Sequence, residues 1–557
     1  MIFSTSPILR ARSLWPMGLV CLFLILWFGT LGERALFHPD EGRYAEIPRE
    51  MVASGDWITP RLNDLKYFEK PVLQYWITAL TFRLLGQEEG PARLWPAVSG
   101  LLTLVLVYFS GRRLGGVRVG VAAAAILAST FQFFLFSQIL TLDMGLTFFL
   151  TLTLSAFLAS QDKRGSPLQR RNWALLTWVA MGLAILSKGL VGLVLPGLIL
   201  VAYIIIERAW KLPGRLSWVR GAALLMVIVL PWFILVQLRN PEFFQFFFVR
   251  EHFSRYTSTE HQRLGAWYYF LGVFLIGALP WSFAYIRAII SSWRMASPDY
   301  FEINPSRLLV LWVVVITLFY SLSSSKLPGY ILPIYPALAL LLGYNVRYWE
   351  LRLLSRYLVG MGATGIAIAV AALTIVYLPK FAAEAGWMVP YVPWAVAGGL
   401  TLLTASLIAW MVLYRRRKLA MTLITIGTLC AFQLLVTGAQ SVARHFSSGA
   451  LVKQAKSTTG NFDPDVPFYS VGMYDQTLPW EIGRTVTLVS YQDELALGIS
   501  QEPERAISSM QEFRERWLAL PQAYAMITPE HFAAEQSRGT SMVVLSSNHK
   551  ALIVARK

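Results

Sequence analysis

The side chains best suited to chemistry gather in one polar segment, residues 37–74, which interrupts the apolar first half of the chain. Asp40 and Glu41 follow a proline, and this order suits the start of a helix at Asp40. Carboxylates there could orient a nucleophile, or Asp40 could simply cap the helix while Glu41 complements its dipole. The segment also carries further charged residues and phenols: Arg43, Tyr44, Lys66, Tyr67, Glu69 and Lys70. A bare connection beside a membrane needs none of these, which favours a functional loop.

Two other segments carry charges beside apolar runs. Asp143 lies in S-Q-I-L-T-L-D-M-G-L, at the mouth of an expected span, where an acid either serves a site or caps the following helix. Lys326 and Tyr330 lie in S-S-S-K-L-P-G-Y, a short turn within 323–336. Lys326 could contact a phosphate, or the segment could be only a turn.

A third segment, R-E-H-F-S-R-Y, carries Arg250, His252 and Arg255 between two apolar runs. Its cations suit a phosphate. His252 together with Glu69 would be a site for a divalent metal, zinc or magnesium, but one histidine and one carboxylate in separate loops form a weak signal. A hydrogen-bonded surface histidine is the favoured alternative for His252.

The elements that position these residues must be membrane helices. Of 557 residues, 55% are hydrophobic and only 15% are charged, so the sequence indicates a polytopic membrane protein. The net charge of +17 does not indicate nucleic-acid binding, because the basic residues form short clusters between apolar runs. Two cysteines in apolar runs support neither a disulfide framework nor a cysteine metal site. The first apolar run, 14–32, lacks a small-residue cleavage signal and is expected to stay as a span.

The basic clusters also predict the topology. Fourteen apolar runs are visible, but the run at 71–86 is short and contains Gln74 and Arg83. If it lies at the interface and the other thirteen runs span, every basic cluster falls on the amino-terminal, cytoplasmic side. The loop 33–90, Asp143, the turn at 323–336 and the carboxy terminus then share the external face.

The chain is predicted to divide into a membrane domain, 1–440, which includes the external loop 33–90, and a soluble α/β domain, 441–557. In the second part the long apolar runs give way to short ones at 467–472, 485–490, 524–528, 542–546 and 551–555. We expect a helix at 501–519 and a hairpin turn at 546–550.

The polar segment resembles the first external loop of a known family. The motifs H-P-D-E-G-R-Y-A-E-I-P-R-E-M, G-D-W-I-T-P-R-L-N and Y-F-E-K-P-V-L-Q-Y-W are similar to those of membrane glycosyltransferases of the GT-C type, which use polyprenyl-phosphate sugars. Within this superfamily they resemble the aminoarabinose transferases that modify lipid A. The likeness extends along the whole chain, although the later motifs are weaker.

The resemblance implies an enzyme of the bacterial inner membrane with its site on the periplasmic side. Such an enzyme takes 4-amino-4-deoxy-L-arabinose from undecaprenyl phosphate and attaches it to a phosphate of lipid A, which lowers the negative charge of that lipid and gives resistance to cationic antimicrobial peptides such as polymyxin. The implied partners are the lipid-linked donor, lipid A and membrane lipids, with no nucleic acid.

The implied site has residues of three kinds. Asp40 and Asp143 are catalytic, since the family carries a second acid at the place of Asp143. Lys70 alone could be a snorkelling lysine, but the resemblance favours phosphate binding. The phosphate-binding residues are Lys70, Arg43, Arg255 and Lys326, and the substrate-binding residues are Glu41, Tyr44, Tyr67 and Tyr330.

Two alternative functions are compatible with the same fold. One is a transferase that moves mannose from a polyprenyl phosphate to a protein hydroxyl, which would demand a stronger general base than an anionic phosphate acceptor does. The other is a lipid transporter without chemistry, for which internal repeats and broken mid-membrane helices would be typical.

Overall fold

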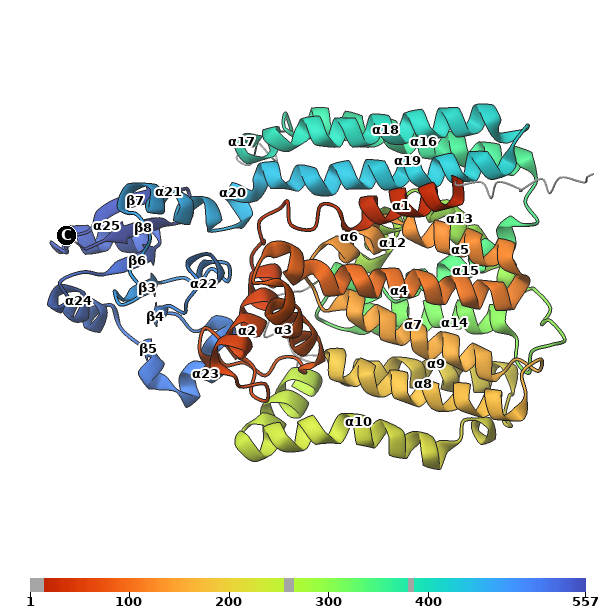
Figure 1. Ribbon diagram of the computed structural model, residues 1–557, viewed down its shortest axis with the longest axis horizontal. Helices are drawn as coiled ribbons and strands as arrows, with labels where there is room; N and C mark the ends of the chain where they lie inside the picture. Colours follow the sequence, from red (N-terminus) through yellow and green to blue (C-terminus); the bar gives the residue numbers. More distant parts are fainter. Residues whose placement is uncertain (1–14, 255–264, 379–384, 557) are drawn as a thin grey trace, which may run out of the picture.

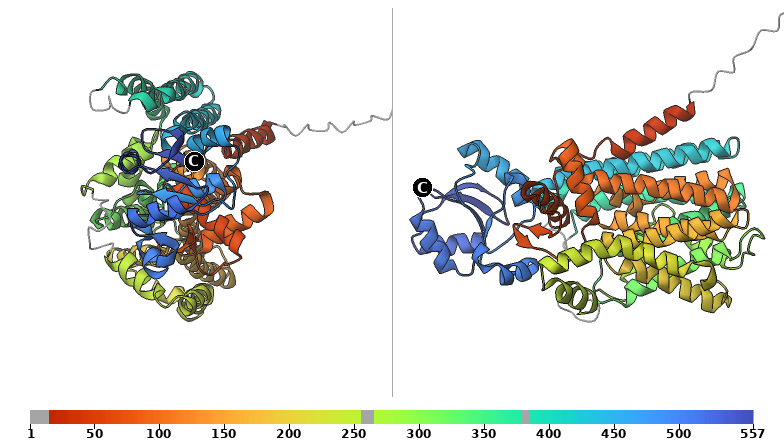
Figure 2. Two further views of the ribbon diagram at one scale, coloured as in Figure 1. Left: turned by 90° about the vertical axis from the view of Figure 1, so that its left-hand side faces the viewer. Right: turned by 60° about the horizontal axis from the view of Figure 1, so that its bottom comes forward.

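A bundle of long helices carries a smaller domain beyond one of its ends (Figure 1). The computed structural model describes residues 15–254, 265–378 and 385–556. Two shorter helices, α2 (Asp40–Ser54) and α3 (Leu73–Leu85), lie between the bundle and the C-terminal domain, and the views in Figure 2 show the same arrangement.

The bundle consists of apolar helices, most of which run along its long axis. These are α1 (Trp15–Phe28), α4 (Glu89–Gly115), α5 (Val117–Ala128), α6 (Phe131–Gln138), α7 (Asp143–Ser160), α8 (Pro167–Lys188), α9 (Val191–Glu207), α10 (Trp218–Arg239), α12 (Tyr269–Gly277), α13 (Ser282–Trp293), α14 (Pro305–Leu322), α15 (Ile334–Val346), α16 (Leu351–Ile375), α18 (Val392–Leu413) and α19 (Arg417–Gly438). Helices α16, α18 and α19 pack together along one side of it.

Short elements connect these helices. They are η1 (Pro213–Arg215), the π-helical η2 (Gln245–Ser254), η3 (Pro328–Ile331), α17 (Ala385–Met388), η5 (Val389–Tyr391), η6 (Ala439–Val442) and α20 (Ala443–Phe446).

The number of membrane spans agrees with the sequence only in part. Within the described ranges, seven helices are long and apolar enough to cross a membrane, and nine are if each of two bent pairs counts as one span. The pairs are α5 with α6, bent by 65°, and α12 with α13, bent by 109°; each corresponds to one run that the sequence presents as continuous. Helices α1, α9 and α15 are apolar but shorter. Thirteen spans therefore remain a prediction.

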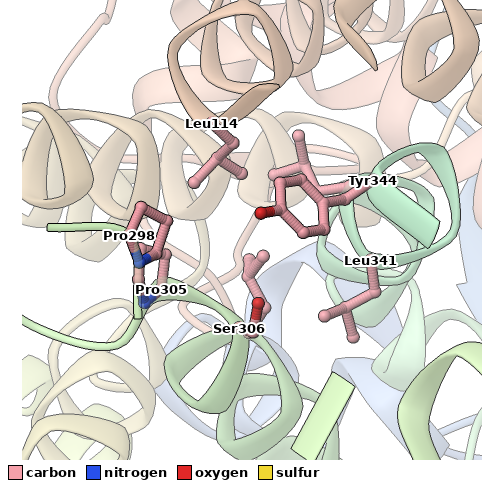
Figure 3. Close-up of a pocket in the computed structure, with 8 residues that line it drawn as sticks. Leu114, Pro298, Pro305, Ser306, Leu341 and Tyr344 are labelled. Carbon is pink, nitrogen blue, oxygen red and sulfur yellow. The ribbon is translucent and has the colours of Figure 1, made fainter. Parts of the chain in front are cut away.

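The predicted basic clusters meet at the end of the bundle far from the C-terminal domain. Asp162, after α7, pairs with Arg113 at 3.3 Å and with Arg164 at 2.7 Å. Glu302 accepts from Arg170 and Arg215, both at 3.2 Å. The cavity in Figure 3 lies at this end, between Leu114 and Tyr344, and its lining carries no charged side chain. This end therefore groups the basic loops as expected and is a poor place for the chemistry.

The polar segment folds into two helices joined by a small hairpin. It contains α2 (Asp40–Ser54), the antiparallel strands β1 (Arg61–Leu62) and β2 (Leu65–Lys66), and α3 (Leu73–Leu85). Helix α2 begins at Asp40, as the sequence predicts. Helix α3 buries Gln74 and Tyr75 against its neighbours while Leu84 and Leu85 are exposed, a pattern that suits the interfacial placement predicted for 71–86.

The C-terminal domain is an α/β domain, as predicted. Its sheet has the order β5-β4-β3-β6-β8-β7; the first four strands are parallel to one another, and β8 and β7 close it as an antiparallel hairpin. The strands are β3 (Phe468–Val471), β4 (Thr487–Val489), β5 (Ala506–Ile507), β6 (Tyr524–Ile527), β7 (Val543–Ser547) and β8 (Leu552–Ala555). The helical elements are α21 (Gly449–Thr459), α22 (Leu478–Ile482), η7 (Asp493–Leu495), α23 (Ala496–Gln501), η8 (Pro503–Arg505), α24 (Met510–Ala519) and α25 (Pro529–Ser537).

One predicted helix is wrong at its start. The expected helix at 501–519 begins only at Met510, where the Ser509 hydroxyl accepts from the Glu512 backbone N–H and caps it. Residues 506–507 before it form the edge strand β5, which pairs with β4. The proline at 503 and the serine cap are the physical reasons for the later start. The predicted hairpin turn at 546–550 is confirmed by the pairing of β7 with β8.

The loop and the C-terminal domain share one apolar core. It contains Leu62 and Leu65 from the hairpin together with Leu488 and Leu495 from the domain. Polar contacts fix the register: Asn63 donates from Nδ2 to the Val486 carbonyl, and Val486 donates its N–H to Asn63 Oδ1, both at 2.8 Å. Removing either partner would leave buried polar groups without a bond.

A half-buried acid at this junction makes the docking sensitive to pH. Burial and the neighbouring Glu89 carboxylate raise the pKa of Glu481, on α22, to about 7. Since the folded protein holds this proton more tightly than the unfolded chain, stability is lost as pH rises from the ordinary pKa of a glutamate to about 7. We therefore expect Glu481→Gln to raise the thermal midpoint of the detergent-solubilised protein at pH 8 and to have little effect at pH 5. Glu504→Gln, at an exposed site, is the control and should behave alike at both pH values; a Glu481→Gln effect independent of pH would contradict the assignment.

Candidate active site

The first candidate acid, Asp40, is not a helix cap. The N-cap position of α2 is Pro39, and no side chain caps the helix there. The Asp40 side chain is 44% exposed and accepts from Arg43 Nη1 at 3.1 Å. Its carboxylate is therefore placed on the first turn of a helix, where negative charge is stabilised, and remains accessible to a ligand.

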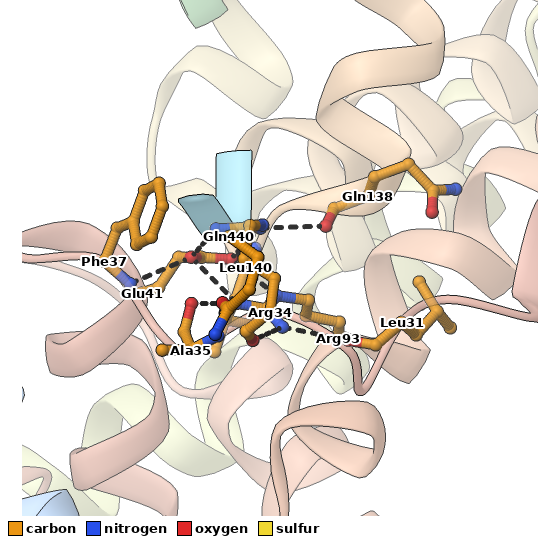
Figure 4. Close-up of polar contacts among 9 residues, drawn as sticks. All are labelled: Leu31, Arg34, Ala35, Phe37, Glu41, Arg93, Gln138, Leu140 and Gln440. Carbon is orange, nitrogen blue, oxygen red and sulfur yellow. Dashed lines mark hydrogen bonds and ion pairs between the residues drawn. The ribbon is translucent and has the colours of Figure 1, made fainter. Parts of the chain in front are cut away.

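Its neighbour Glu41 has the opposite surroundings. The side chain is buried between Arg34, at 2.7 Å, and Arg93, at 2.8 Å. Its oxygens also accept from the backbone N–H groups of Phe37 and Leu140, both at 3.0 Å (Figure 4). Burial alone would raise the pKa of Glu41, but the two guanidinium groups hold it well below its usual range.

The contacts of Glu41 join four segments next to Asp40: the stretch before α2, α2 itself, α4 and the connection from α6 to α7. Arg93 comes from α4 and also donates to the carbonyls of Leu31, Arg34 and Ala35, while Leu140 lies between α6 and α7. We expected Glu41 to bind substrate. Its oxygens are instead occupied by protein donors, so its contacts favour a role in positioning α2.

The second candidate acid, Asp143, forms an ion pair with a residue that is distant in the sequence. It begins α7, and Lys188, the last residue of α8, donates to its Oδ1. Both side chains are largely buried, at 15% and 12% exposed. The Lys188 ammonium also lies 5.2 Å from the ring centroid of Tyr330. The turn at 323–336 covers this pair closely, since a Cβ on Gly329 would lie 2.5 Å from the Asp143 Cγ.

Gln74 of α3 bonds to the residues that precede Asp143 and Lys188 and so helps to hold this ion pair in place. Its Nε2 donates to the Leu142 carbonyl at 2.8 Å and to the Ser187 hydroxyl at 2.6 Å. Its Oε1 accepts from the Trp95 indole at 3.1 Å. The Gln74 side chain is 2% exposed, so water does not reach these groups. Its amide therefore supplies the hydrogen bonds that the polar groups need where α7 begins and α8 ends.

Tyr44 connects the two acids. Burial raises the pKa of its phenol well above the usual value, and the carboxylates of Asp40, Glu69 and Asp143 raise it further, while Arg43 opposes them. Asp40 and Asp143 therefore act electrostatically on one hydroxyl from different elements. The phenol stays protonated and can donate a hydrogen bond to an anionic ligand. Its ring lies beside that of Tyr75, with centroids 6.2 Å apart.

Arg43 and Tyr67 form the adjoining part of the cluster. Arg43 reaches Asp40 through Nη1 and Glu494, in the C-terminal domain, through Nη2. Tyr67 is buried beside these charges. Burial, followed by the Glu69 and Glu494 charges, raises the pKa of Tyr67 well above its usual value, although Arg43 opposes the shift. The predicted residues Asp40, Arg43, Tyr44, Tyr67 and Glu69 thus come together.

The other predicted cations differ in their surroundings. Lys70 donates to the Glu69 carbonyl at 2.8 Å, beside the cluster. Lys326 is buried and donates to the carbonyls of Ser321 and Ser323 at 2.9 and 2.7 Å, which satisfies the carboxyl end of α14. These contacts favour a structural task for Lys326 over the phosphate contact that we expected.

Two predicted residues fall outside what the structure describes. Arg255 lies in the undescribed range, and of His252 only the backbone, within η2, is described. The predicted metal pair of Glu69 and His252 is therefore not placed. Among the described side chains, no group of three or more His, Cys, Asp and Glu residues is arranged to hold a metal ion.

Two functional candidates were missed from the sequence, Lys188 and Glu494. Lys188 ends an apolar run on the external side, where a basic residue is disfavoured, so its position was a usable signal. Glu494 lies in D-E-L after a strand, where it resembles any exposed acid, and nothing in the sequence pairs it with Arg43.

Comparisons with known proteins show that the chain is similar to glycosyltransferases. Residues 13–247 match the family model described as dolichyl-phosphate-mannose-protein mannosyltransferase. Residues 454–556 match the model of the aminoarabinose transferase C-terminal domain.

Curated relatives carry one name, undecaprenyl phosphate-alpha-4-amino-4-deoxy-L-arabinose arabinosyl transferase. The protein from Edwardsiella ictaluri is 31% identical over 69% of this chain and 71% of its own length. The protein from Erwinia tasmaniensis is 35% identical over 59% of this chain and 58% of its own length, so that alignment spans less than two thirds of the relative.

Solved structures agree over a longer stretch. The crystal structure of ArnT from Cupriavidus metallidurans bound to undecaprenyl phosphate matches with a TM-score of 0.92 at 34% identity, covering 98% of each chain. An oligosaccharyltransferase from Archaeoglobus fulgidus matches with a TM-score of 0.51 at 13% identity, which shows a likeness of fold alone.

The buried ion pairs of Glu41 predict a large effect of a small substitution. Glu41→Gln keeps the shape of the side chain but leaves Arg34 and Arg93 without their counter-ion, which should destabilise the protein by about 3 to 5 kcal/mol. The measurement is the loss of stability in detergent, followed by tryptophan fluorescence during denaturation. Glu512→Gln, which breaks the exposed pair with Arg516 at 2.7 Å, should cost no more than about 1 kcal/mol. Equal losses in the two variants would show that the Glu41 cluster does not hold the loop.

Proposed function

Because this chain belongs to the undecaprenyl phosphate-aminoarabinose arabinosyltransferases, we propose that it transfers 4-amino-4-deoxy-L-arabinose from undecaprenyl phosphate to a phosphate of lipid A. One arrangement carries the proposal: the loop that bears the Asp40–Arg43 pair also contacts, through Gln74, the helix ends that bear the Asp143–Lys188 pair. Two acids and two cations at one end of a membrane bundle suit a reaction between phosphate-bearing lipids.

The reaction exchanges one phosphate for another at the anomeric carbon of the sugar. The bond between this carbon and the undecaprenyl phosphate oxygen breaks, and its electron pair leaves with that phosphate. An oxygen of the lipid A phosphate supplies the pair for the new bond. Since the acceptor is already an anion, no strong general base is required, and Asp40 orients the reacting groups.

The remaining residues have roles that follow from their charges. Arg43 and Lys70 stabilise the charge that develops on the leaving phosphate. Asp143, held by Lys188, binds the amine of the sugar or assists Asp40. Tyr44 donates to a phosphate oxygen, and Tyr67 and Tyr330 line the site beside Arg43 and Lys188.

The product carries less negative charge than unmodified lipid A, because the attached sugar brings an amine. A less anionic membrane surface attracts cationic peptides more weakly. The consequence that we propose is resistance to cationic antimicrobial peptides such as polymyxin.

The alternative of protein mannosylation has support from the model matched by residues 13–247. The match of residues 454–556 to the aminoarabinose transferase C-terminal domain favours lipid A as the acceptor. The two bent helix pairs, α5–α6 and α12–α13, are a feature that a transporter without chemistry would share, but the similarity to arabinosyl transferases favours an enzyme.

The chain is a multi-pass membrane protein, and we propose that it lies in the bacterial inner membrane with Asp40 and the domain 441–557 on the periplasmic side. The basic loops at the opposite end of the bundle support this orientation, since positive loops stay in the cytoplasm. We propose the membrane domain as residues 1–440, including the external loop 33–90.

The function is tested by transfer assays on two carboxylate variants. Asp40→Asn should reduce transfer by about 100-fold or more, because the amide keeps the size of the side chain but removes the charge that orients the reactants. Asp143→Asn should be impaired as well. The measurement is mass spectrometry of lipid A after incubation of detergent-solubilised enzyme with the lipid-linked donor. Wild-type enzyme that leaves lipid A unmodified would overturn the function, and full activity of Asp40→Asn would remove Asp40 from the site.

The orientation is tested by labelling cysteines in intact cells after Cys21 and Cys430 are changed to serine. Gln87→Cys, in the exposed turn after α3, should react with a membrane-impermeant maleimide from outside the inner membrane. Leu168→Cys, exposed near the start of α8 at the basic end, should react only after permeabilisation. The reverse pattern would invert the topology and place the site in the cytoplasm.

A further inference from the structure

The C-terminal domain enters the site through Glu494, on the short helix η7 (Asp493–Leu495). This carboxylate pairs with Arg43 Nη2 through Oε2, and Gln476 donates to its Oε1. The side chains are 6% exposed for Arg43 and 11% for Glu494, so the pair is largely removed from water. Both oxygens of Glu494 therefore have a partner.

Close packing holds this contact in place. A Cβ on Gly42 would lie 2.6 Å from the Gln476 carbonyl oxygen and 2.8 Å from the Thr477 nitrogen. Only a glycine permits α2 to approach the segment before α22 so closely. Arg43, the next residue of α2, is thereby placed within reach of the domain.

We propose that Glu494 is a positioning residue that holds the Arg43 guanidinium between itself and Asp40, so that the C-terminal domain completes the phosphate-binding site. The proposal rests on the proposed function for the identity of the ligand, a polyprenyl phosphate. It goes beyond that function in making the domain a working part of the site.

The geometry of Arg43 supports this role. Asp40 accepts from Nη1 at 3.1 Å, and Glu494 binds Nη2, so carboxylates from two parts of the chain fix the plane of the guanidinium. Among the described residues, the buried Nε–H of Arg43 has no hydrogen-bond partner. It is a donor that a phosphate oxygen can satisfy when a ligand binds.

The charges explain why a second carboxylate is needed. Arginine and a carboxylate frequently form a bidentate pair, with two parallel N–H···O bonds. Without Glu494, Arg43 would therefore close on Asp40 and withdraw both residues from the ligand. Burial raises the pKa of Glu494 above its usual value, and the Arg43 guanidinium opposes this shift.

The structure offers a matched control in the same interface. Glu502, at the end of α23, pairs with Arg61 of the loop at 3.0 Å, and their side chains are 13% and 21% exposed. This pair joins the same two parts of the chain but contacts neither Asp40 nor Arg43. Glu502→Gln therefore reports the loss of one interface ion pair without disturbing the guanidinium.

The test uses the full-length protein with undecaprenyl phosphate as the probe. Glu494→Gln should weaken binding of this lipid about tenfold and lower kcat about tenfold, because Arg43 is no longer held toward the ligand. In an Arg43→Gln background the same substitution should change binding less than about twofold, since the residue that it positions is absent. Glu502→Gln should match Glu494→Gln in thermal stability while retaining normal binding and kcat.

The outcomes separate the proposal from the function on which it rests. Unchanged binding and kcat in Glu494→Gln, or equal losses in Glu502→Gln, would overturn the positioning role and reduce Glu494 to an interface contact. An effect of Glu494→Gln that persists undiminished without Arg43 would overturn it as well. If wild-type protein transfers no aminoarabinose but its binding of undecaprenyl phosphate depends on Glu494 through Arg43, the function fails while the positioning role stands.

Discussion

The constraint on which the site depends is the neutralisation of buried charge around Glu41. Arg93 is 1% exposed, and an ion so far from water costs several kcal/mol unless an opposite charge and hydrogen bonds compensate it. Glu41 supplies the charge, and the carbonyls of the segment before α2 supply the bonds. Because the residues of this cluster come from four parts of the chain, namely the segment before α2, α2 itself, α4 and the connection from α6 to α7, the first turn of α2 can occupy only one position. Asp40, on that turn, is positioned as a consequence.

The other residues of the site are likewise held in place by contacts from other parts of the chain. Asp143 and Lys188 begin and end different helices, and the buried amide of Gln74 bonds to the backbone or side chains of their neighbours. Arg43 lies on the loop, yet its Nη2 pairs with Glu494 of the C-terminal domain. The loop and this domain also share an apolar core, so neither is a separate attachment to the bundle. A site assembled in this way depends on contacts distant in sequence, which makes it rigid once folded and hard to foresee beforehand.

The sequence was informative where local chemistry decides structure. The proline before Asp40 predicted the start of α2, the short apolar runs predicted an α/β domain and coincide with five of its strands, and the motifs of the loop predicted the family, all confirmed. The sequence was uninformative where pairing is distant: Asp143 and Lys188 are 45 residues apart, and Glu494 has no local feature that distinguishes it from a surface acid. Glu41 is predicted to touch substrate because its type and spacing are those of a site residue, and its pairs with Arg34 and Arg93, which favour a positioning role, have no signal in the sequence. The helix at 501–519 was drawn too long because an edge strand of two residues leaves no periodic signal.

Asp40 and Glu41 show how adjacent carboxylates acquire opposite tasks. Both lie on the first turn of α2, where the helix dipole stabilises negative charge. The backbone rotates about 100° per residue in a helix, so one side chain faces the bundle and the other faces the ligand side. Glu41 meets two guanidinium groups and is committed to them, whereas Asp40 stays 44% exposed with one guanidinium that it shares with Glu494. A shared partner neutralises less of the Asp40 charge than an exclusive one would, which supports the orienting role that we propose for that carboxylate.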